Sequence, residues 1–367
     1  MTDIPWWEPK TGNKELALIK DVLESNVLND AEVTAELENR ISHLLGCQYA
    51  VAVTSGTAAL FMALAALGVG PGDEVIIPDA TFIATANAVR LTGAVPVLVD
   101  VEVDRLTIDV AAVKKSINSK TKAVIPVHVS GRAANLTELQ RVALDNEVFV
   151  VEDAAESFMS KYNGRYLGTI GTLGCFSFSP MKLITTGQGG LVTTNDAELY
   201  QRLRQLKDQG RPMRGTGGDD PHPTIGYNFK LTNVQAAIGL GQLESLEERM
   251  AHMRHLYELY QRGLQSVSQV KLLKFEIDKG ELPLWLDILA DQRDDLEAYL
   301  RTKGIDCRKF WYPIHTQPCY LESDDKFPNC MKSLPKALWL PSALSLTDDD
   351  VDKVCAEIEL FYDNVVV

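Results

Sequence analysis

The chain has 367 residues, of which 46% are hydrophobic, and a formal net charge of −14. A single hydrophobic core stops growing at ~250–300 residues, so this length predicts a large domain with a smaller one beside it. The excess of negative charge argues against binding to nucleic acid or to anionic membranes, although a local cluster of cations could still bind an anionic small molecule.

The N-terminal residues and the cysteines indicate a cytoplasmic protein. Residues 1–10 have neither the basic start nor the apolar core of a secretory signal. The longest apolar run, Ala58 to Leu67, is far shorter than the ~20 residues of a membrane-spanning helix. The six cysteines form no CxxC pair, which disfavours a disulfide framework and a zinc site. We therefore expect reduced thiols and no bound metal.

Strands and helices alternate through the first two-thirds of the chain. Five short, almost continuous apolar runs are typical of parallel strands buried on both faces. These runs are Val51–Val53, Glu74–Pro78, Val95–Val99, Lys122–Val127 and Glu147–Glu152. The helical stretches between them are Thr57–Leu67, Ile83–Arg90, Val110–Ile117 and Leu136–Leu144. The alternation predicts an α/β domain with a mostly parallel sheet.

A smaller unit follows at the C-terminal end. The amphipathic stretch Thr232–Leu264 predicts a helix or a helix pair that leaves the large domain. The later segments are strand-like at Leu284–Leu289, helical at Asp291–Lys303, strand-like at Ala337–Leu340 and helical after Thr347, a candidate N-cap. We predict a large domain over residues 1–249 and a small α+β domain over residues 250–367.

The segment Thr54-Ser55-Gly56-Thr57 is a candidate anion site. It follows a predicted strand and opens an apolar helix, whose free amides and dipole favour a phosphate. Gly56 lets the backbone approach a ligand closely, and Thr57 can add a hydroxyl. The same residues could equally form an ordinary helix cap.

Two further segments supply a carboxylate and an amine. Asp153 lies at the end of an apolar strand, where ligands of open α/β sheets bind, and it could pair with a pyridinium nitrogen. Lys182 lies between the strand-like residues 176–178 and a glycine-rich turn, where burial would make its amine nucleophilic. Ser177 could donate a hydroxyl to the same phosphate, and Phe82 could stack on the ring.

These residues make the chain resemble the DegT-type family of nucleotide-sugar aminotransferases, which use pyridoxal 5′-phosphate and have the aspartate aminotransferase fold (fold type I). The resemblance covers nearly the whole chain in order. It includes SGTAAL at 55–60, GDEVIIPDATF at 72–82, EDAAES at 152–157, SFSPMKLITTGQGG at 177–190, GYNFKLTNVQAAIGLGQL at 226–243 and YPIHTQPCY at 312–320. It implies a mixed, mostly parallel seven-stranded sheet flanked by helices.

The resemblance also assigns roles to particular residues. Lys182 would hold the cofactor as a Schiff base, and Asp153 would pair with its ring nitrogen. The other implied cofactor contacts are Gly56, Thr57, Phe82, Glu156, Ser177 and Asn228, the last reaching the neighbouring subunit of a homodimer with shared active sites. The implied substrate contacts are His315, Tyr320, Lys230 and Arg308, with Lys309 and Arg214 as further candidate cations for a diphosphate.

Several positions depart from the commoner family pattern. Glu156 replaces a Gln beside the cofactor's phenolic oxygen, where a charged carboxylate would be repelled unless it were protonated or turned away. Members that resemble perosamine synthases also have Glu there. Met181, Gln188 and Lys230 replace Asn, Glu and Arg, and a lysine cannot reproduce the bidentate grip of an arginine. Val129-Ser130 replaces Leu-Tyr.

The residues after Lys182 resemble those of family members that act at C4 of the sugar. The implied reaction moves an amino group from L-glutamate to a 4-keto-6-deoxy nucleotide sugar used for surface polysaccharide. The first candidate is GDP-4-keto-6-deoxymannose, giving GDP-perosamine, and the alternative is a UDP- or dTDP-linked sugar. A non-catalytic regulator that binds the cofactor is a further alternative, as is a metal site at His252 and His255, which we interpret as two surface histidines.

Overall fold

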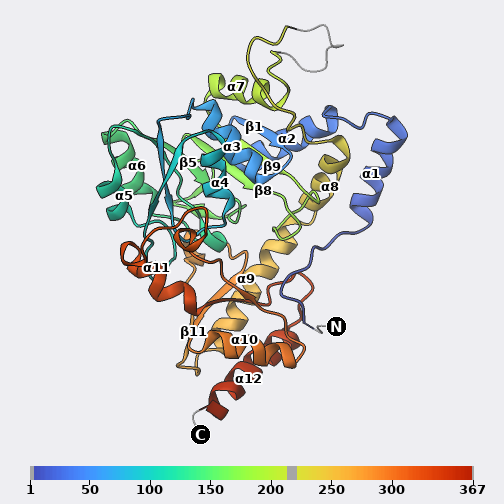
Figure 1. Ribbon diagram of the computed structural model, residues 1–367. Coiled ribbons are helices and arrows are strands. Elements are labelled where there is room, and N and C mark those ends of the chain that lie inside the picture. The colour runs from blue at the N-terminus through green and yellow to red at the C-terminus, as the bar shows by residue number, and fades with distance from the viewer. Residues whose placement is uncertain (1–3, 213–220, 366–367) are drawn as a thin grey trace.

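A computed structural model describes residues 4–212 and 221–365. These residues form two bodies, seen in Figure 1 as an upper one around a large sheet and a lower one around a smaller sheet. The predicted candidate Arg214 lies outside the described residues. The boundary predicted between residues 249 and 250 falls within the helix Leu246–Gly263.

The large sheet has seven strands in the order β1-β9-β8-β5-β4-β2-β3. Only β9 runs antiparallel to its neighbours, and the other pairs are parallel. The bounds are β1 Tyr49–Val53, β2 Glu74–Pro78, β3 Val95–Val99, β4 Thr121–Val124, β5 Phe149–Asp153, β8 Leu173–Ser177 and β9 Gly190–Thr194. A short hairpin joins β6 Lys161–Tyr162 to β7 Arg165–Tyr166. The expected mixed, mostly parallel seven-stranded sheet is confirmed.

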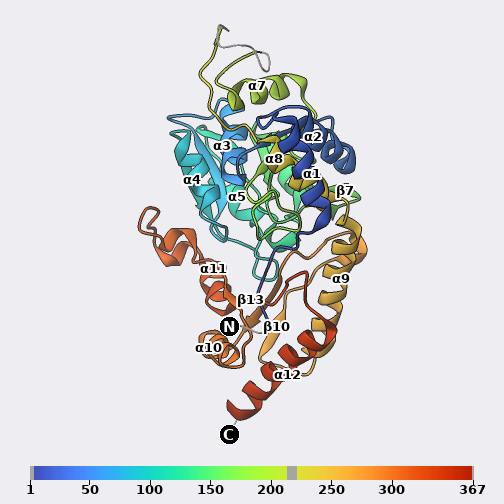
Figure 2. The same cartoon turned by 90° about the vertical axis from the view of Figure 1, so that its right-hand side faces the viewer.

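Helices cover both sides of this sheet, so that α1 and α4 lie on opposite sides of the upper body in Figure 2. The helices of the upper body are α1 Asn13–Ser25, α2 Glu32–Leu45, α3 Gly56–Ala66, α4 Ala84–Leu91, α5 Val110–Ser116, α6 Leu136–Asp145, α7 Ala197–Lys207 and α8 Asn233–Leu243. The helix α3 packs against α4, α7 and the sheet, which explains why most of its residues are apolar and buried.

The lower body is built on an antiparallel sheet in the order β10-β11-β13-β12. Its elements are α9 Leu246–Gly263, β10 Val270–Leu272, β11 Leu286–Ala290, α10 Arg293–Thr302, β12 Arg308–Lys309, α11 Pro328–Ser333, β13 Ala337–Leu340 and α12 Asp348–Val365. The predicted helix pair is confirmed as α8 and α9, and α9 runs from one body to the other (Figure 1). The Thr347 hydroxyl accepts the Asp350 N–H at 3.3 Å, which confirms the predicted N-cap.

The N-terminal residues pack on the lower body. Ile4 forms a bridge with Ile305, and the Trp6 ring centroid lies 5.5 Å from that of Trp285 and 5.9 Å from that of Trp339. The start of the predicted large domain therefore contributes to the core around the smaller sheet.

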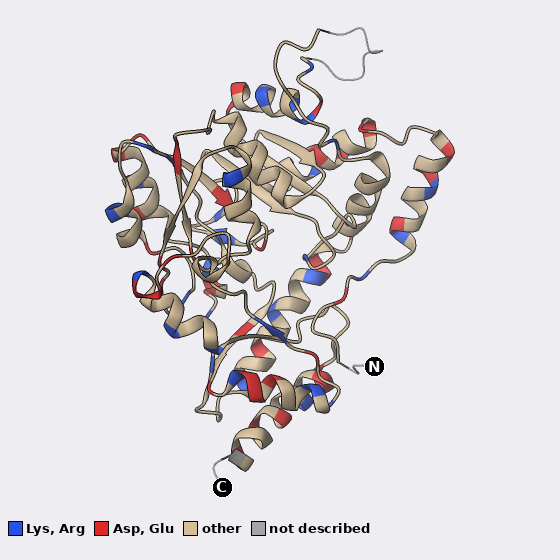
Figure 3. Ribbon diagram, in the orientation of Figure 1, with Lys and Arg blue, Asp and Glu red and all other residues tan. Residues whose placement is uncertain are grey.

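Charged residues are spread over both bodies, with positive and negative segments mixed along the outer helices in Figure 3. Within the described residues, no helix has both the length and the apolar character to cross a membrane.

Candidate active site

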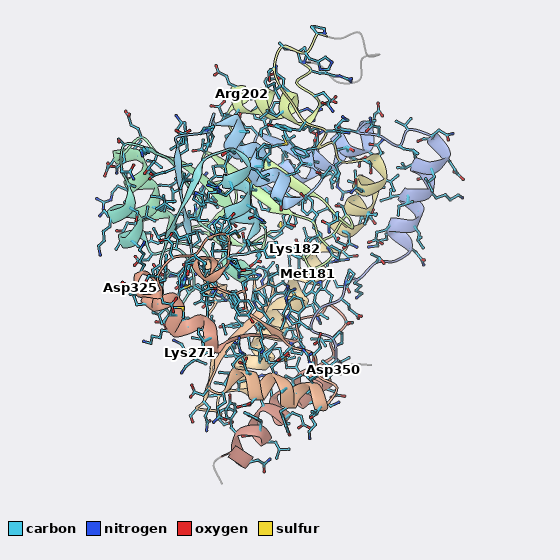
Figure 4. The ribbon with its side chains drawn as sticks, viewed as in Figure 1. Met181, Lys182, Arg202, Lys271, Asp325 and Asp350 are labelled. Carbon is cyan, nitrogen blue, oxygen red and sulfur yellow. The ribbon has the colours of Figure 1, made fainter. Side chains whose placement is uncertain are left out.

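A cavity of about 250 Å3 lies where the large sheet meets the lower body. The strands β1, β2, β4, β5 and β8 all run in one direction, so the residues that follow their carboxyl ends gather at one edge of the sheet. This edge provides Ser55, Gly56, Thr57, Thr81, Phe82, Thr85, Val127, Asp153, Glu156 and Ser177 to the cavity wall. Figure 4 shows Lys182 and Met181 near the junction of the two bodies.

Lys182 lies in the turn after β8, with its side chain 12% exposed. Its Nζ is 3.5 Å from Glu156 Oε1 and 4.5 Å from the centroid of the Trp285 ring. Burial lowers the pKa of Lys182, while the negative charges of Glu156 and Asp153 act in the opposite direction. The lowered pKa increases the neutral fraction of the amine, which is the nucleophilic form.

Glu156 is the nearest carboxylate to this amine. Its Oε2 accepts the backbone N–H of Ser130 at 2.9 Å. Burial raises the pKa of Glu156 to about 7, although Lys182 pulls it down. Glu156 can therefore exchange a proton near neutral pH.

Asp153 ends β5 and is fixed by two donors. The Thr85 hydroxyl donates to Oδ2 at 2.8 Å, and the Ala155 backbone N–H donates to Oδ1 at 3.2 Å. Thr85 lies 2.9 Å from the Thr81 hydroxyl, which extends the chain of polar contacts. Burial raises the pKa of Asp153, and the Thr85 bond opposes this change. Each Asp153 oxygen keeps a lone pair that could accept a hydrogen bond from a protonated ring nitrogen.

The N-terminus of α3 carries the residues of the predicted anion site. Ser55 caps the helix by accepting the Ala58 N–H at 3.1 Å. A Cβ at Gly56 would lie 2.9 Å from the Ser177 Cβ, so the absence of a side chain lets the helix start approach the end of β8. Free amides and hydroxyls, Thr57 among them, then line one end of the cavity. An amine, a buried carboxylate and an anion site together fit the carbonyl, ring nitrogen and phosphate of pyridoxal phosphate.

The lower body closes the cavity with aromatic side chains that the sequence reasoning missed. Trp285, Trp311 and Trp339 line it, together with the half-exposed Phe82, whose ring centroid is 6.3 Å from that of Trp311. No local motif marks these tryptophans. They come together only because the antiparallel sheet of the lower body faces the upper body.

Arg308 also lines the cavity, as predicted for a substrate contact. Its guanidinium carbon lies 5.0 Å from the centroid of the Trp6 ring, and its NH1 lies 3.2 Å from Met181 Sδ. The aromatic contact orients a positive charge toward the cavity wall.

Two predicted substrate contacts have their polar atoms bonded to other side chains of the chain. His315 is fully buried, with Nδ1 2.6 Å from Asp79 Oδ2 and Nε2 3.1 Å from Asp324 Oδ1. The Tyr320 hydroxyl donates to Asn87 Oδ1 at 2.7 Å. Neither residue is among those that line the cavity. Both instead fix the segment that carries Trp311.

The remaining predicted residues lie away from this cavity. Lys230 pairs with Asp208 at 2.7 Å, and Lys309 pairs with Asp294 at 2.8 Å. Asn228 is exposed and does not line the cavity of its own chain.

The histidine pair considered as a metal site has separate partners. His255 Nε2 lies 2.9 Å from Asp348 Oδ1, and His252 Nε2 lies 3.3 Å from the Ala343 carbonyl oxygen. No group of three potential metal ligands occurs among the described residues.

Comparisons with known proteins agree with this geometry. A model of the DegT/DnrJ/EryC1/StrS aminotransferase family matches residues 9–359. A relative named GDP-perosamine synthase, from Escherichia coli O157:H7, is 37% identical over 366 residues, covering 99% of each chain. The crystal structure of the aminotransferase TlmJ from Streptoalloteichus hindustanus has a TM-score of 0.94 and 29% identity, covering 99% of this chain and 100% of that one. The PLP form of the sugar aminotransferase Spr1654 from Streptococcus pneumoniae has a TM-score of 0.93 and 25% identity, with the same coverage.

Proposed function

Because the chain belongs to the DegT/DnrJ/EryC1/StrS aminotransferase family, we propose that it transfers the amino group of L-glutamate to C4 of GDP-4-keto-6-deoxymannose. The product would be GDP-perosamine, a precursor of surface polysaccharide. The relative named GDP-perosamine synthase supports this choice of sugar and nucleotide. The observation that carries the amino transfer is the Lys182 amine, buried beside Glu156 at the carboxyl edge of the sheet.

Pyridoxal phosphate is the cofactor of this aminotransferase, and when bound it supplies a carbonyl that carries the amino group and a ring that accepts electrons from the reacting carbon. Lys182 would hold its carbonyl carbon, and Asp153 would pair with its ring nitrogen. Gly56, Thr57 and Ser177 would hold its phosphate.

Lys182 also moves protons in this proposal. Its Nζ, once released by the incoming amine, takes a proton from the reacting carbon as a general base. Burial lowers the pKa of this amine and so favours the neutral form that accepts a proton. Glu156, 3.5 Å away and with a pKa of about 7, can exchange protons with the same nitrogen. The indole rings of Trp285 and Trp339 exclude water from the amine.

Arg308 is the proposed cation for the anionic substrates. It lines the cavity, and its charge is oriented by the Trp6 ring. His315 and Tyr320 would support the sugar site through the segment between them rather than by direct contact, because their polar atoms bind Asp79 and Asn87. Phe82 is placed at the cavity wall where it could stack on the cofactor ring.

We also infer a homodimer with shared active sites. The exposed side chain of Asn228, outside the cavity of its own chain, supports a contact with the partner's cofactor. Mixing Lys182→Ala with Asn228→Ala protein should restore activity, because a mixed dimer has one site without either change. Inactive mixtures with demonstrated subunit exchange would contradict the shared site.

A cytoplasmic location fits the cysteines. All six lie in the described part of the chain and are free thiols. Free thiols are typical of a reducing compartment. Localisation of the tagged protein by cell fractionation tests this proposal.

The decisive test is the absorbance spectrum of the protein with pyridoxal phosphate, before and after adding L-glutamate. The band of the lysine-bound cofactor should appear in the wild type, disappear with glutamate, and return when GDP-4-keto-6-deoxymannose is added. A return only with UDP- or dTDP-linked sugars would contradict the GDP assignment but keep the amino transfer. A band that ignores glutamate would contradict the proposed donor.

A further inference from the structure

The turn Val129–Gly131 belongs to the upper body and contacts the lower body beside the active site. Ser130 in this turn is fully buried and has φ 53° and ψ 15°. This left-handed conformation is energetically unfavourable for residues that have a Cβ. Non-glycine residues in such conformations are kept only where the surroundings hold them. The contacts of Ser130 explain what holds it here.

Ser130 makes four hydrogen bonds, and each polar atom of the residue takes part. Its backbone N–H donates to Glu156 Oε2 at 2.9 Å, and its carbonyl oxygen accepts the Leu284 N–H at 2.8 Å. Its hydroxyl donates to Asp287 Oδ1 at 2.9 Å and accepts the indole N–H of Trp339 at 3.3 Å. The hydroxyl therefore anchors the turn to the lower body, while the N–H reaches Glu156 in the upper body.

Both backbone hydrogen bonds of Ser130 connect it to a segment that contacts the Lys182 amine. Glu156 is the carboxylate 3.5 Å from Lys182 Nζ. Leu284 immediately precedes Trp285, whose ring centroid is 4.5 Å from the same nitrogen. A shift of the turn would therefore move the Glu156 carboxylate and the Trp285 ring relative to the Lys182 amine.

The packing of the turn leaves little room for such a shift. A Cβ at Gly131 would lie 2.0 Å from the Leu282 carbonyl oxygen, so the two segments are in direct backbone contact. The Asp287 anchor is itself held by an ion pair with Arg132, and both side chains are fully buried.

We propose that Ser130 is a positioning residue: its hydroxyl holds the left-handed turn, and the turn holds Glu156 and Trp285 against the Lys182 amine. This inference rests on the proposed role of Lys182. It assigns a part in positioning the active-site groups to a residue that does not line the cavity.

The charged groups that act on the Lys182 amine are known from the structure. Glu156 and Asp153 raise its proton affinity, and Arg308 lowers it. Glu156 is in turn affected by Asp153 and Asp287. Of the three groups that act directly on the amine, only Glu156 is bonded to Ser130, so displacement of the turn should weaken the effect of Glu156 first.

The test compares Ser130→Ala with Ser130→Gly. Both variants lose the hydroxyl, but alanine is disfavoured in the left-handed conformation whereas glycine adopts it freely. The alanine turn should relax and withdraw its N–H from Glu156, which lowers the pH midpoint of the cofactor absorbance at Lys182 by about 1 unit. The glycine variant should keep a midpoint near that of the wild type.

Three controls separate this role from simple packing. Ser342→Ala removes another buried hydroxyl, one that donates to the Leu340 carbonyl oxygen and accepts the Leu286 N–H but does not bond the turn, and it should leave the midpoint unchanged. Ser130→Ala added to Glu156→Gln should cause no further shift, because the proposed effect passes through Glu156. The pKa of Lys182 in the cofactor-free chain, measured by competitive acetylation and mass spectrometry, should fall in Ser130→Ala as well.

Equal midpoints for the alanine and glycine variants, or the same shift in Ser342→Ala, would overturn the positioning role. A wild type that binds no cofactor would contradict the proposed function instead, and the acetylation measurement would still decide the role of Ser130.

Discussion

Replacing Glu156 by glutamine tests the electrostatic coupling at the reacting amine. Glu156 Oε1 lies 3.5 Å from Lys182 Nζ, and the two side chains are 6% and 12% exposed. An opposite charge at this range raises the pKa of a lysine by about 1–3 units, equivalent to about 1–4 kcal/mol. Glutamine keeps the shape and the bond from Ser130 but removes the charge. We therefore expect the pKa of Lys182 to fall in Glu156→Gln.

The pH dependence of this effect follows from the pKa of Glu156. Burial raises that pKa to about 7, so the carboxyl is largely protonated, and hence neutral, below pH 7. The rates at which wild type and variant capture pyridoxal phosphate should converge below pH 7 and separate above it, where the variant has more neutral amine and reacts faster. Stopped-flow absorbance across the pH range measures these rates.

The matched control is Glu281→Gln, which removes another buried carboxylate that does not act on Lys182. The reasoning is refuted if Glu156→Gln leaves the capture profile unchanged or slows capture above pH 7. It is also refuted if the control produces the same change.

Three further substitutions test other parts of the site. Lys182→Ala should abolish product formation, measured by release of the amino sugar nucleotide, while circular dichroism shows an intact fold. Full activity of this variant would contradict the assignment of Lys182 as the residue that holds the cofactor. Gly56→Ala places a Cβ 2.9 Å from the Ser177 Cβ, so we expect weaker cofactor binding by spectroscopic titration and a loss of about 1–3 kcal/mol in urea unfolding; unchanged affinity would contradict the anion site. Arg132→Ala leaves Asp287 buried without its ion pair, and it should lower the free energy of unfolding by about 3–5 kcal/mol; a loss near zero would show that water reaches Asp287.

The order of strands and helices could be read from the sequence because it depends on local patterns. Apolar runs such as Glu74–Pro78 and Val95–Val99 became β2 and β3 with the same bounds. The ends of strands were predicted less well: the strand predicted over Lys122–Val127 is Thr121–Val124 in the structure, so it begins one residue earlier and ends three residues earlier. Where a strand stops depends on its neighbours in the sheet, which the local pattern does not contain.

The cofactor end of the site was also predictable, because its residues follow strand ends. Gly56, Asp153 and Ser177 each stand directly after or at the end of an apolar run, and parallel strands bring such positions to one edge. Lys182 was recognisable from its glycine-rich context in the same way.

Only the tertiary structure decided which residues surround the cofactor end of the site. The family resemblance implied that His315 lies near the substrate, and the fold adds that its ring nitrogens contact Asp79 and Asp324. Nothing in the sequence groups Ser130 with Trp285, since those residues are far apart in the chain. The sequence by itself determined the elements and the reacting groups, because these depend on neighbours along the backbone. The aromatic wall, the pKa of about 7 at Glu156 and the anchored turn arise from burial between two bodies, which no local stretch of sequence can specify.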